Sequence, residues 1–115
     1  GANPARSEGA LRAAPPRPGQ HPPAVALTDA AREKLDITLY STSWCGYCKK
    51  ARAWFTSQGI PFVEKDIERD AGAAAEYRGK SNGYTGVPLI DVNGTAVRGF
   101  DQGRIQSLMA AAIAR

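Results

Sequence analysis

The 115-residue sequence is poor in residues that bind metals, with Cys45, Cys48 and His21 as its only cysteines and histidine. A structural zinc site usually needs four Cys or His ligands, so a site within this chain would need carboxylates to complete it. We therefore expect no metal site. The longest apolar stretches are only a few residues, too short to cross a bilayer. We expect no membrane insertion.

The sequence also lacks a concentrated charge of one sign. The formal net charge is +4, but the basic residues are spread thinly and form no stripe interleaved with aromatics. Nucleic-acid binders usually carry such a stripe, so we expect no nucleic-acid partner. The length and the hydrophobic content of 43% are typical of one globular domain, which we expect to be monomeric.

Large apolar side chains are almost absent from the first part of the chain, which is rich in Pro, Ala, Gly and Arg. Such a segment cannot bury enough surface to offset its ordering entropy. We predict a disordered or extended tail over residues 1–34 and a folded domain over residues 35–115. Residues 27–35 could form a short helix, capped by Thr28 or Asp29, that lies against the domain or stays mobile.

Residues 35–115 alternate between strand patterns and helix patterns. We predict strands over residues 37–40, 60–67, 87–92 and 95–98, and helices over residues 45–57, 71–78 and 102–115. Gly59 and Gly79 are expected to end the first two helices, and Asn93-Gly94 indicates a hairpin. The order β-α-β-α-β-β-α predicts an α/β fold: a four-stranded mixed sheet with helices on both faces.

The two cysteines are separated by only two residues, in Cys45-Gly46-Tyr47-Cys48. As a structural disulfide the pair would be poorly placed. The loop-entropy model gives roughly 2 kcal/mol for so short a loop, against about 4 kcal/mol for a loop of roughly 60 residues.

A redox function explains the placement better. A strand that ends just before a helix puts Cys45 at the helix N-terminus, where free N–H groups and the helix dipole stabilise a thiolate. Lys49 and Lys50 add positive charge. We expect Cys45 to lie open, with a pKa well below that of a free thiol, and Cys48 to be more buried. Cys45 would attack a disulfide and Cys48 would resolve the mixed disulfide.

Residues 36–115 resemble the glutaredoxin branch of the thioredoxin-fold family. The resemblance rests on "YSTSWCGYC" after a strand, on "TGVP" at 85–88, on the Asn93-Gly94 hairpin and on "RGFD" at 98–101 before the last helix. A lone Cys-x-x-Cys is a weak signal, but four matches in the same order are a strong one. The resemblance implies a thioredoxin/glutaredoxin fold and a cis peptide bond before Pro88.

The resemblance also implies a glutathione-linked thiol–disulfide oxidoreductase that reduces protein disulfides or glutathione mixed disulfides. Val87 would hydrogen-bond the cysteinyl part of glutathione, the start of the last helix would receive its γ-glutamyl end, and Tyr47 would line the groove. Together the expected groove residues are Tyr47, Val87, Pro88, Gly99, Phe100 and Asp101. Glutathione would be a co-substrate, with no tightly bound cofactor.

The sequence departs from the family pattern at several positions. Thr42 stands where many glutaredoxins carry Lys, so a cation for a glutathione carboxylate is absent, and Gly46 stands where many carry Pro. Gly86 interrupts the T-V-P match, and Arg98 and Gln102 replace a Gly and an acid around "GFD". The "RGFD" turn is also similar to that of glutaredoxin-like electron donors coupled to thioredoxin reductase, and Gly46 leaves an iron–sulfur cluster shared between two subunits as a further alternative.

The cysteine usage bears on the compartment. A Cys-x-x-Cys pair in a cytosolic protein is usually catalytic, because structural disulfides are rare there. We therefore expect a cytoplasmic protein. The alternative is a periplasmic domain for which the Pro-rich segment serves as a tether.

Overall fold

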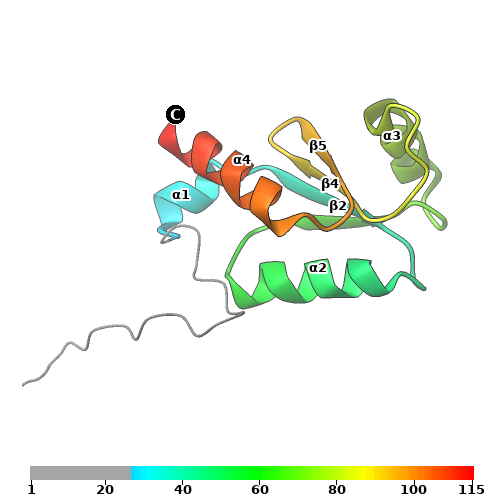
Figure 1. Cartoon of the computed structure of the whole chain (residues 1–115), viewed down its shortest axis with the longest axis horizontal. Helices are drawn as coiled ribbons and strands as arrows, with labels where there is room; N and C mark the ends of the chain where they lie inside the picture. Colours follow the sequence, from blue (N-terminus) through cyan, green and yellow to red (C-terminus); the bar gives the residue numbers. More distant parts are fainter. Residues whose placement is uncertain (1–26) are drawn as a thin grey trace, which may run out of the picture.

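The computed structural model describes residues 27–115, so most of the predicted tail lies outside the described residues. Along the chain the elements are α1 (Asp29–Glu33), β2 (Ile37–Ser41), α2 (Gly46–Ser57), β3 (Val63–Asp66), α3 (Ala71–Ser81), β4 (Leu89–Val92), β5 (Thr95–Arg98) and α4 (Gln102–Ala114). They form a four-stranded mixed sheet with helices packed on it (Figure 1). The predicted thioredoxin/glutaredoxin fold is confirmed.

The sheet has the order β3-β2-β4-β5, with β2 parallel to β3 and antiparallel to β4. Ser41 pairs with Asp66, Tyr40 with Leu89, and Leu89 with Arg98. These pairs bring the C-terminal ends of β2, β3 and β5 and the N-terminal end of β4 to the same end of the sheet. The loop that carries both cysteines leaves from this end.

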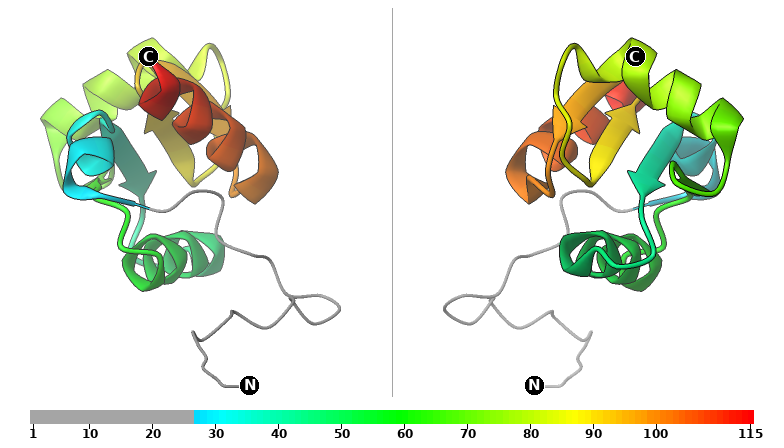
Figure 2. Two further views of the ribbon diagram at one scale, coloured as in Figure 1. Left: turned by 90° about the vertical axis from the view of Figure 1, so that its left-hand side faces the viewer. Right: turned by 90° about the vertical axis from the view of Figure 1, so that its right-hand side faces the viewer.

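Each face of the sheet has its own hydrophobic cluster. The larger cluster packs α2 and α4 on one face, with Leu39, Phe55, Ile90, Ile105 and Met109 among its buried residues. The smaller cluster, Tyr40, Tyr77 and Leu89, packs α3 on the other face. Figure 2 shows α2 and α3 on opposite sides of the sheet. Side chains of β2 alternate between the two clusters, as the period of a strand requires.

Local signals define both ends of α2. Cys45 is its N-cap, and Gly59 follows the C-cap with a φ of +68°, in the left-handed region that favours glycine. The N–H groups of Gly59 and Ile60 donate to the carbonyls of Thr56 and Phe55, the Schellman pattern. The predicted helix end at Gly59 is therefore confirmed.

Two predicted strand starts were too early, for a shared physical reason. β3 begins at Val63 because the N–H of Ile60 belongs to the α2 cap and Pro61 has no N–H to donate. β4 begins at Leu89, one residue after Pro88. A proline cannot donate to a strand ladder, so each strand starts beyond one.

The predicted end of α3 at Gly79 was wrong, because the helix continues to Ser81. The left-handed residue is Asn82, with a φ of +52°, rather than Gly79. Nη2 of Arg98 on β5 lies 3.5 Å from the Ser81 carbonyl and 3.3 Å from that of Asn82. These contacts partner carbonyls that a helix end leaves free.

The short predicted helix forms as α1, with Thr28 as its N-cap. Arg32 Nε donates to the carbonyl of Gly59, and Lys34 Nζ donates to the carbonyls of Ile113 and Arg115. Leu27 and Leu35 pack against the larger cluster. Residues 27–35 thus lie against the domain, at the end of the sheet opposite the cysteines.

Candidate functional site

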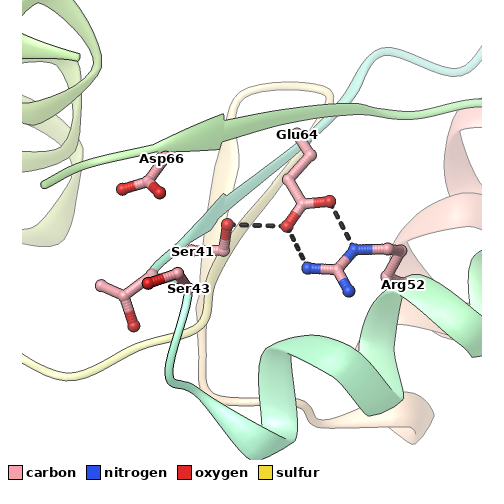
Figure 3. Close-up of a pocket in the computed structure, with 6 residues that line it drawn as sticks. Ser41, Ser43, Arg52, Glu64 and Asp66 are labelled. Carbon is pink, nitrogen blue, oxygen red and sulfur yellow. Dashed lines mark hydrogen bonds and ion pairs between the residues drawn. The ribbon is translucent and has the colours of Figure 1, made fainter. Parts of the chain in front are cut away.

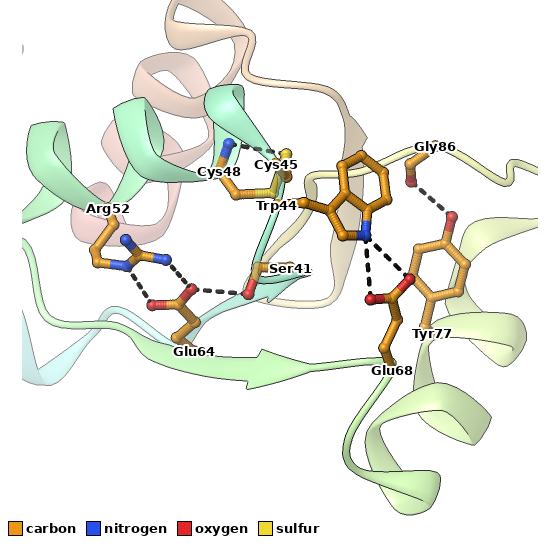
Figure 4. The surroundings of a disulfide bond; sticks show 9 residues. All are labelled: Ser41, Trp44, Cys45, Cys48, Arg52, Glu64, Glu68, Tyr77 and Gly86. Atoms are coloured by element: carbon orange, nitrogen blue, oxygen red, sulfur yellow. Dashed lines mark hydrogen bonds and ion pairs between the residues drawn. A yellow bond between two sulfur atoms is a disulfide. The ribbon is translucent and has the colours of Figure 1, made fainter.

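Cys45 and Cys48 form a disulfide at the N-terminus of α2, with their Cα atoms 5.2 Å apart (Figure 4). The backbone N–H of Cys48 donates to Cys45 Sγ at 3.1 Å, so this sulfur is the capping acceptor of the helix. Cys48 is fully buried, as predicted, but Cys45 is only 5% exposed and does not lie open. The predicted open position of Cys45 was therefore wrong for this disulfide form, in which Cys45 Sγ is bonded to the buried sulfur of Cys48.

This capping geometry determines what the sulfur can do once the disulfide is reduced. A helix N-terminus presents unpaired N–H groups and the positive end of the dipole, and both stabilise an anion. Cys45 Sγ already accepts one of these N–H groups in the oxidised protein. Lys49 and Lys50 are exposed on the first turn, with Lys50 Nζ 5.0 Å from the ring centroid of Tyr47. The first turn therefore favours a thiolate at Cys45.

On the β4 side of the cysteine loop, the backbone forms a closed turn. The Val87–Pro88 peptide bond is cis, as the resemblance implied, and Pro88 is buried. The N–H of Gly99 donates to the carbonyl of Pro88 at 2.9 Å, which ties the last turn before α4 to this bond. Gly99 has a φ of +78°, so the turn needs a residue without a Cβ. Sequence reasoning missed Tyr77, whose hydroxyl donates to the Gly86 carbonyl at 2.6 Å.

The start of α4 lies next to this turn. Asp101 is exposed and caps the helix, with its carboxylate accepting the N–H of Arg104 at 3.1 Å. Phe100 is half-buried, and its ring packs against Trp54 of α2 with centroids 5.8 Å apart. The sheet register and the Gly99–Pro88 bond place Val87, Pro88 and residues 99–101 at the same end of the sheet as Cys45. Their binding roles stay predictions, as does that of Tyr47, which is 63% exposed.

On the β3 side, a polar network that sequence reasoning missed lies beside the cysteine loop (Figures 3 and 4). Arg52 forms two hydrogen bonds of 2.6 Å with the carboxylate of Glu64, and the buried hydroxyl of Ser41 donates to the same carboxylate at 2.7 Å. The hydrogen bonds from Arg52 lower the pKa of Glu64, against a smaller opposing effect of burial. Arg52 lies one turn after Cys48, which is the signal that could have placed it on this face.

Trp44 is a second residue that sequence reasoning missed. It is 69% exposed, and its indole N–H donates to both carboxylate oxygens of Glu68 at 3.1 Å. The contact joins the cysteine loop to the loop that follows β3. No sequence signal pairs a residue before Cys45 with one more than 20 positions later; only the strand register does.

Within residues 27–115, no three His, Cys, Asp or Glu side chains gather where they could hold a metal ion. Over the same residues, none of the helices has the length and apolar character that crossing a membrane requires.

Comparisons with known proteins relate this fold and site to one family. The glutaredoxin family model matches residues 37–97. A glutaredoxin-like 8.6 kDa protein from the rubredoxin operon of Clostridium pasteurianum is 34% identical over 73 residues, 64% of this chain and 96% of that protein. Glutaredoxin 3 of Escherichia coli is 33% identical over 66 residues, 57% of this chain and 78% of its own.

Among solved structures, the NrdH-redoxin of Escherichia coli, described as a glutaredoxin-like protein with a thioredoxin-like activity profile, has a TM-score of 0.56. Its sequence identity is 23%, covering 64% of this chain and 93% of that one, so it shows the fold alone. The family match and the Clostridium relative decide the assignment. The chain belongs to the glutaredoxin family.

Proposed function

Starting from its membership of the glutaredoxin family, we propose that this chain is a thiol–disulfide oxidoreductase that reduces protein disulfides and glutathione mixed disulfides. The observation that carries the proposal is the hydrogen bond from the Cys48 N–H to Cys45 Sγ at 3.1 Å. It supports Cys45 as the nucleophile, because the attacking species in disulfide exchange is the thiolate.

The two cysteines would act in sequence. The Cys45 thiolate attacks one sulfur of the substrate disulfide, a new S–S bond forms, and the first product leaves as a thiolate that takes up a proton. Cys48 then loses its proton and attacks Cys45 Sγ, which releases the second product thiol and forms the Cys45–Cys48 disulfide. The substrate has gained two electrons. Both sulfurs are nearly buried, but only Cys45 Sγ caps the helix, so the remaining thiol, that of Cys48, is assigned the resolving role.

Glutathione would restore the dithiol, with two molecules supplying the two electrons and leaving as glutathione disulfide. In this proposal the backbone of Val87, next to Pro88, pairs with the cysteinyl part of glutathione. The N–H of Phe100 and the N–H groups at the start of α4 receive the γ-glutamyl carboxylate beside Gly99, and Asp101 takes its ammonium. The exposed ring of Tyr47 lines the other wall, 63% accessible to solvent.

One observation favours a second reductant. Thr42 stands where many glutaredoxins carry a lysine, and because its side chain is uncharged it offers no cation to a glutathione carboxylate. A thioredoxin-reductase-coupled electron donor would not need that cation. The fold likeness to NrdH-redoxin, whose activity profile is described as thioredoxin-like, agrees with this alternative.

Two matched assays separate these functions. In both assays the substrate is a glutathione mixed disulfide. The first assay supplies electrons from glutathione, glutathione reductase and NADPH, and the second supplies them from thioredoxin reductase and NADPH. We expect turnover in the first; turnover only in the second would assign the thioredoxin-reductase role. A visible iron–sulfur absorption in anaerobically purified protein, with turnover in neither assay, would assign a cluster-binding module instead.

The two cysteine variants test the sequence of steps. Cys45→Ser should remove all turnover, because no nucleophile remains. Cys48→Ser should keep turnover of the glutathione mixed disulfide and lose reduction of protein disulfides, since only the second reaction needs a resolving thiol. Equal loss in both variants would contradict the division of roles.

The direction of the reaction bears on location and assembly. A disulfide reductase needs a compartment with a reducing thiol pool, which is why we propose the cytoplasm. Both cysteines of one chain suffice for the cycle, so we propose that the protein works as a monomer.

A further inference from the structure

A polar pocket of about 340 Å³ lies on the β3 side of the cysteine loop. Its lining residues are Ser41, Thr42, Ser43, Arg52, Glu64 and Asp66 (Figure 3). They come from the end of β2 and the loop that follows it, from β3 and from α2. In the sheet order, β3 and β4 flank β2 on opposite sides, so the pocket lies across the cysteine loop from the proposed glutathione groove.

Thr42 and Asp66, which line the pocket, each have a side-chain oxygen with hydrogen-bonding capacity left. Thr42 is 4% exposed, and its Oγ1 has no hydrogen-bond partner within the described part of the chain. A buried hydroxyl without a partner costs about 1–3 kcal/mol, which a ligand in the pocket could offset. Asp66 Oδ1 accepts the N–H groups of Glu68 and Arg69, while its Oδ2 lies 3.8 Å from Arg69 Nε, beyond hydrogen-bond distance.

The charge of the pocket indicates the sign of a ligand. Two carboxylates and one guanidinium line it, and that guanidinium, on Arg52, donates two hydrogen bonds to Glu64 and forms an ion pair with it. The other carboxylate, that of Asp66, lies 3.8 Å from Nε of Arg69, whose side chain is 79% exposed. The lining residues therefore carry one more negative than positive charge. A cation in the pocket would lie beside Asp66 Oδ2 and the side chains of Thr42 and Ser43.

We propose that this pocket is a subsite for a lysine or arginine side chain of the disulfide-bearing protein substrate. The proposal rests on the proposed function, because it assumes that the substrate's disulfide is presented to Cys45. An ammonium group would donate to Asp66 Oδ2 and to Thr42 Oγ1, and it would leave the Arg52–Glu64 pair intact.

The position of the pocket explains what the subsite would add. The groove on the β4 side offers mainly backbone groups, which pair with any extended peptide. The pocket on the β3 side offers side chains of definite charge, which select among peptides by their sequence. Trp44, bonded to Glu68, ties together the two loops that border the pocket. A substrate bound to both sides would be held across the sulfur of Cys45.

The test uses peptides that each carry one cysteine in a mixed disulfide with glutathione, with a single Lys moved one position at a time along either side of that cysteine. A matching set carries Gln in place of Lys. At low salt, we expect the peptide with Lys in at least one position to have a kcat/KM roughly threefold to tenfold higher than that of its Gln partner. The difference should come from a lower KM. The preference should shrink at high salt.

Asp66→Asn should remove the preference, because it keeps the acceptor for the N–H groups of Glu68 and Arg69 and loses only the charge. Thr42→Val should weaken the preference without lowering the melting temperature, since it deletes a hydroxyl that has no partner. Glu33→Gln is the matched control: Glu33 is exposed on α1 at the far end of the sheet, so the preference should persist. Turnover of hydroxyethyl disulfide should stay unchanged in all three variants.

Two outcomes would overturn the subsite: equal kcat/KM for every Lys and Gln pair, or a preference that survives Asp66→Asn. A binding experiment separates this failure from failure of the proposed function. A peptide with Ser in place of its cysteine is titrated into the oxidised protein and followed by amide chemical shifts. Chemical-shift changes at residues 41–43 and 66 that occur with the Lys peptide and not with the Gln peptide support the subsite, even if no disulfide is turned over. Shifts that added KCl or free lysine reproduces in full would show a general cation site instead, and would also overturn the proposal.

Discussion

The two sides of the cysteine loop differ in structure: the main chain forms the β4 side, and side chains form the β3 side. On the β4 side, a cis peptide bond, a left-handed glycine and the hydrogen bond from Gly99 to Pro88 fix the shape of the main chain. On the β3 side, the Ser41–Glu64–Arg52 network and the pocket are made of side chains. Recognition of backbone is independent of sequence, whereas recognition by side chains is not. We infer that the β4 side serves the reaction common to all substrates and the β3 side distinguishes between them.

The strongest test of this comparison is Gly99→Ala. A left-handed residue with a Cβ costs about 1–2 kcal/mol, and no neighbouring atom lies within 4 Å of the new Cβ, so the cost is conformational. The Gly99–Pro88 turn should loosen, and turnover should fall for small and protein substrates alike. Urea denaturation and the glutathione assay measure the two effects.

Gly94→Ala is the matched control for that variant. Gly94 also has a positive φ, +94°, and open space around it, but it lies in the hairpin at the opposite end of the sheet. Stability should fall by a similar amount with turnover unchanged. Equal turnover in both variants would contradict the inference that the β4 side serves the reaction common to all substrates.

The next largest effect is expected from Asp101→Ala, compared with Asp70→Ala. Each aspartate caps a helix by accepting one N–H at 3.1 Å, so each variant should lose about 1 kcal/mol of stability. Only Asp101→Ala should also raise the KM for a glutathione mixed disulfide, because only Asp101 belongs to the proposed groove. A KM that rises equally in both variants would reduce Asp101 to a capping residue.

On the β3 side, Glu64→Gln should cost about 0.5–1 kcal/mol at neutral pH, because it replaces a bidentate ion pair whose partners are partly exposed. The sign of the pH dependence follows from the lowered pKa of Glu64 in the folded state, caused mainly by Arg52. The stabilisation is fully present above the unfolded pKa near 4.5 and is lost as the pH falls through the lower folded pKa.

Denaturation of wild type and Glu64→Gln, measured at neutral and at strongly acidic pH, checks this sign. The difference between the two proteins should shrink as the pH falls. A difference that stays constant would mean that packing, not charge, accounts for the contribution of Glu64.

The smallest effect is expected from Trp44→Phe. This variant keeps an aromatic ring and loses the N–H that bonds Glu68, so stability should change by about 0.5 kcal/mol or less. Hydroxyethyl disulfide should be turned over as before, while the kcat/KM for a protein disulfide should fall modestly. A larger change for the small substrate than for the protein would show that Trp44 acts on the cysteines and not on substrate selection.

The two sides also differ in how far the sequence predicts them. Cys45 at the start of α2, Gly59 at its end and the Asn93-Gly94 hairpin are local signals, because each depends on residues within a few positions. The network of Ser41, Arg52 and Glu64 depends on the pairing of β2 with β3, which no short segment encodes. The predicted end of α3 at Gly79 was wrong, and the observed end includes a contact that no short segment encodes: Arg98, on a distant strand, reaches the carbonyls of Ser81 and Asn82.

The packing of α1 on α4 has a practical use. Lys34 binds the carbonyls of Ile113 and Arg115, so Arg115 lies beside α1, at the end of the molecule opposite the start of α2 (Figure 1). An anchor attached at residue 115 would orient the disulfide away from a solid support. Protein immobilised in this way on an electrode or sensor chip would present its sulfurs to every soluble partner in one uniform orientation.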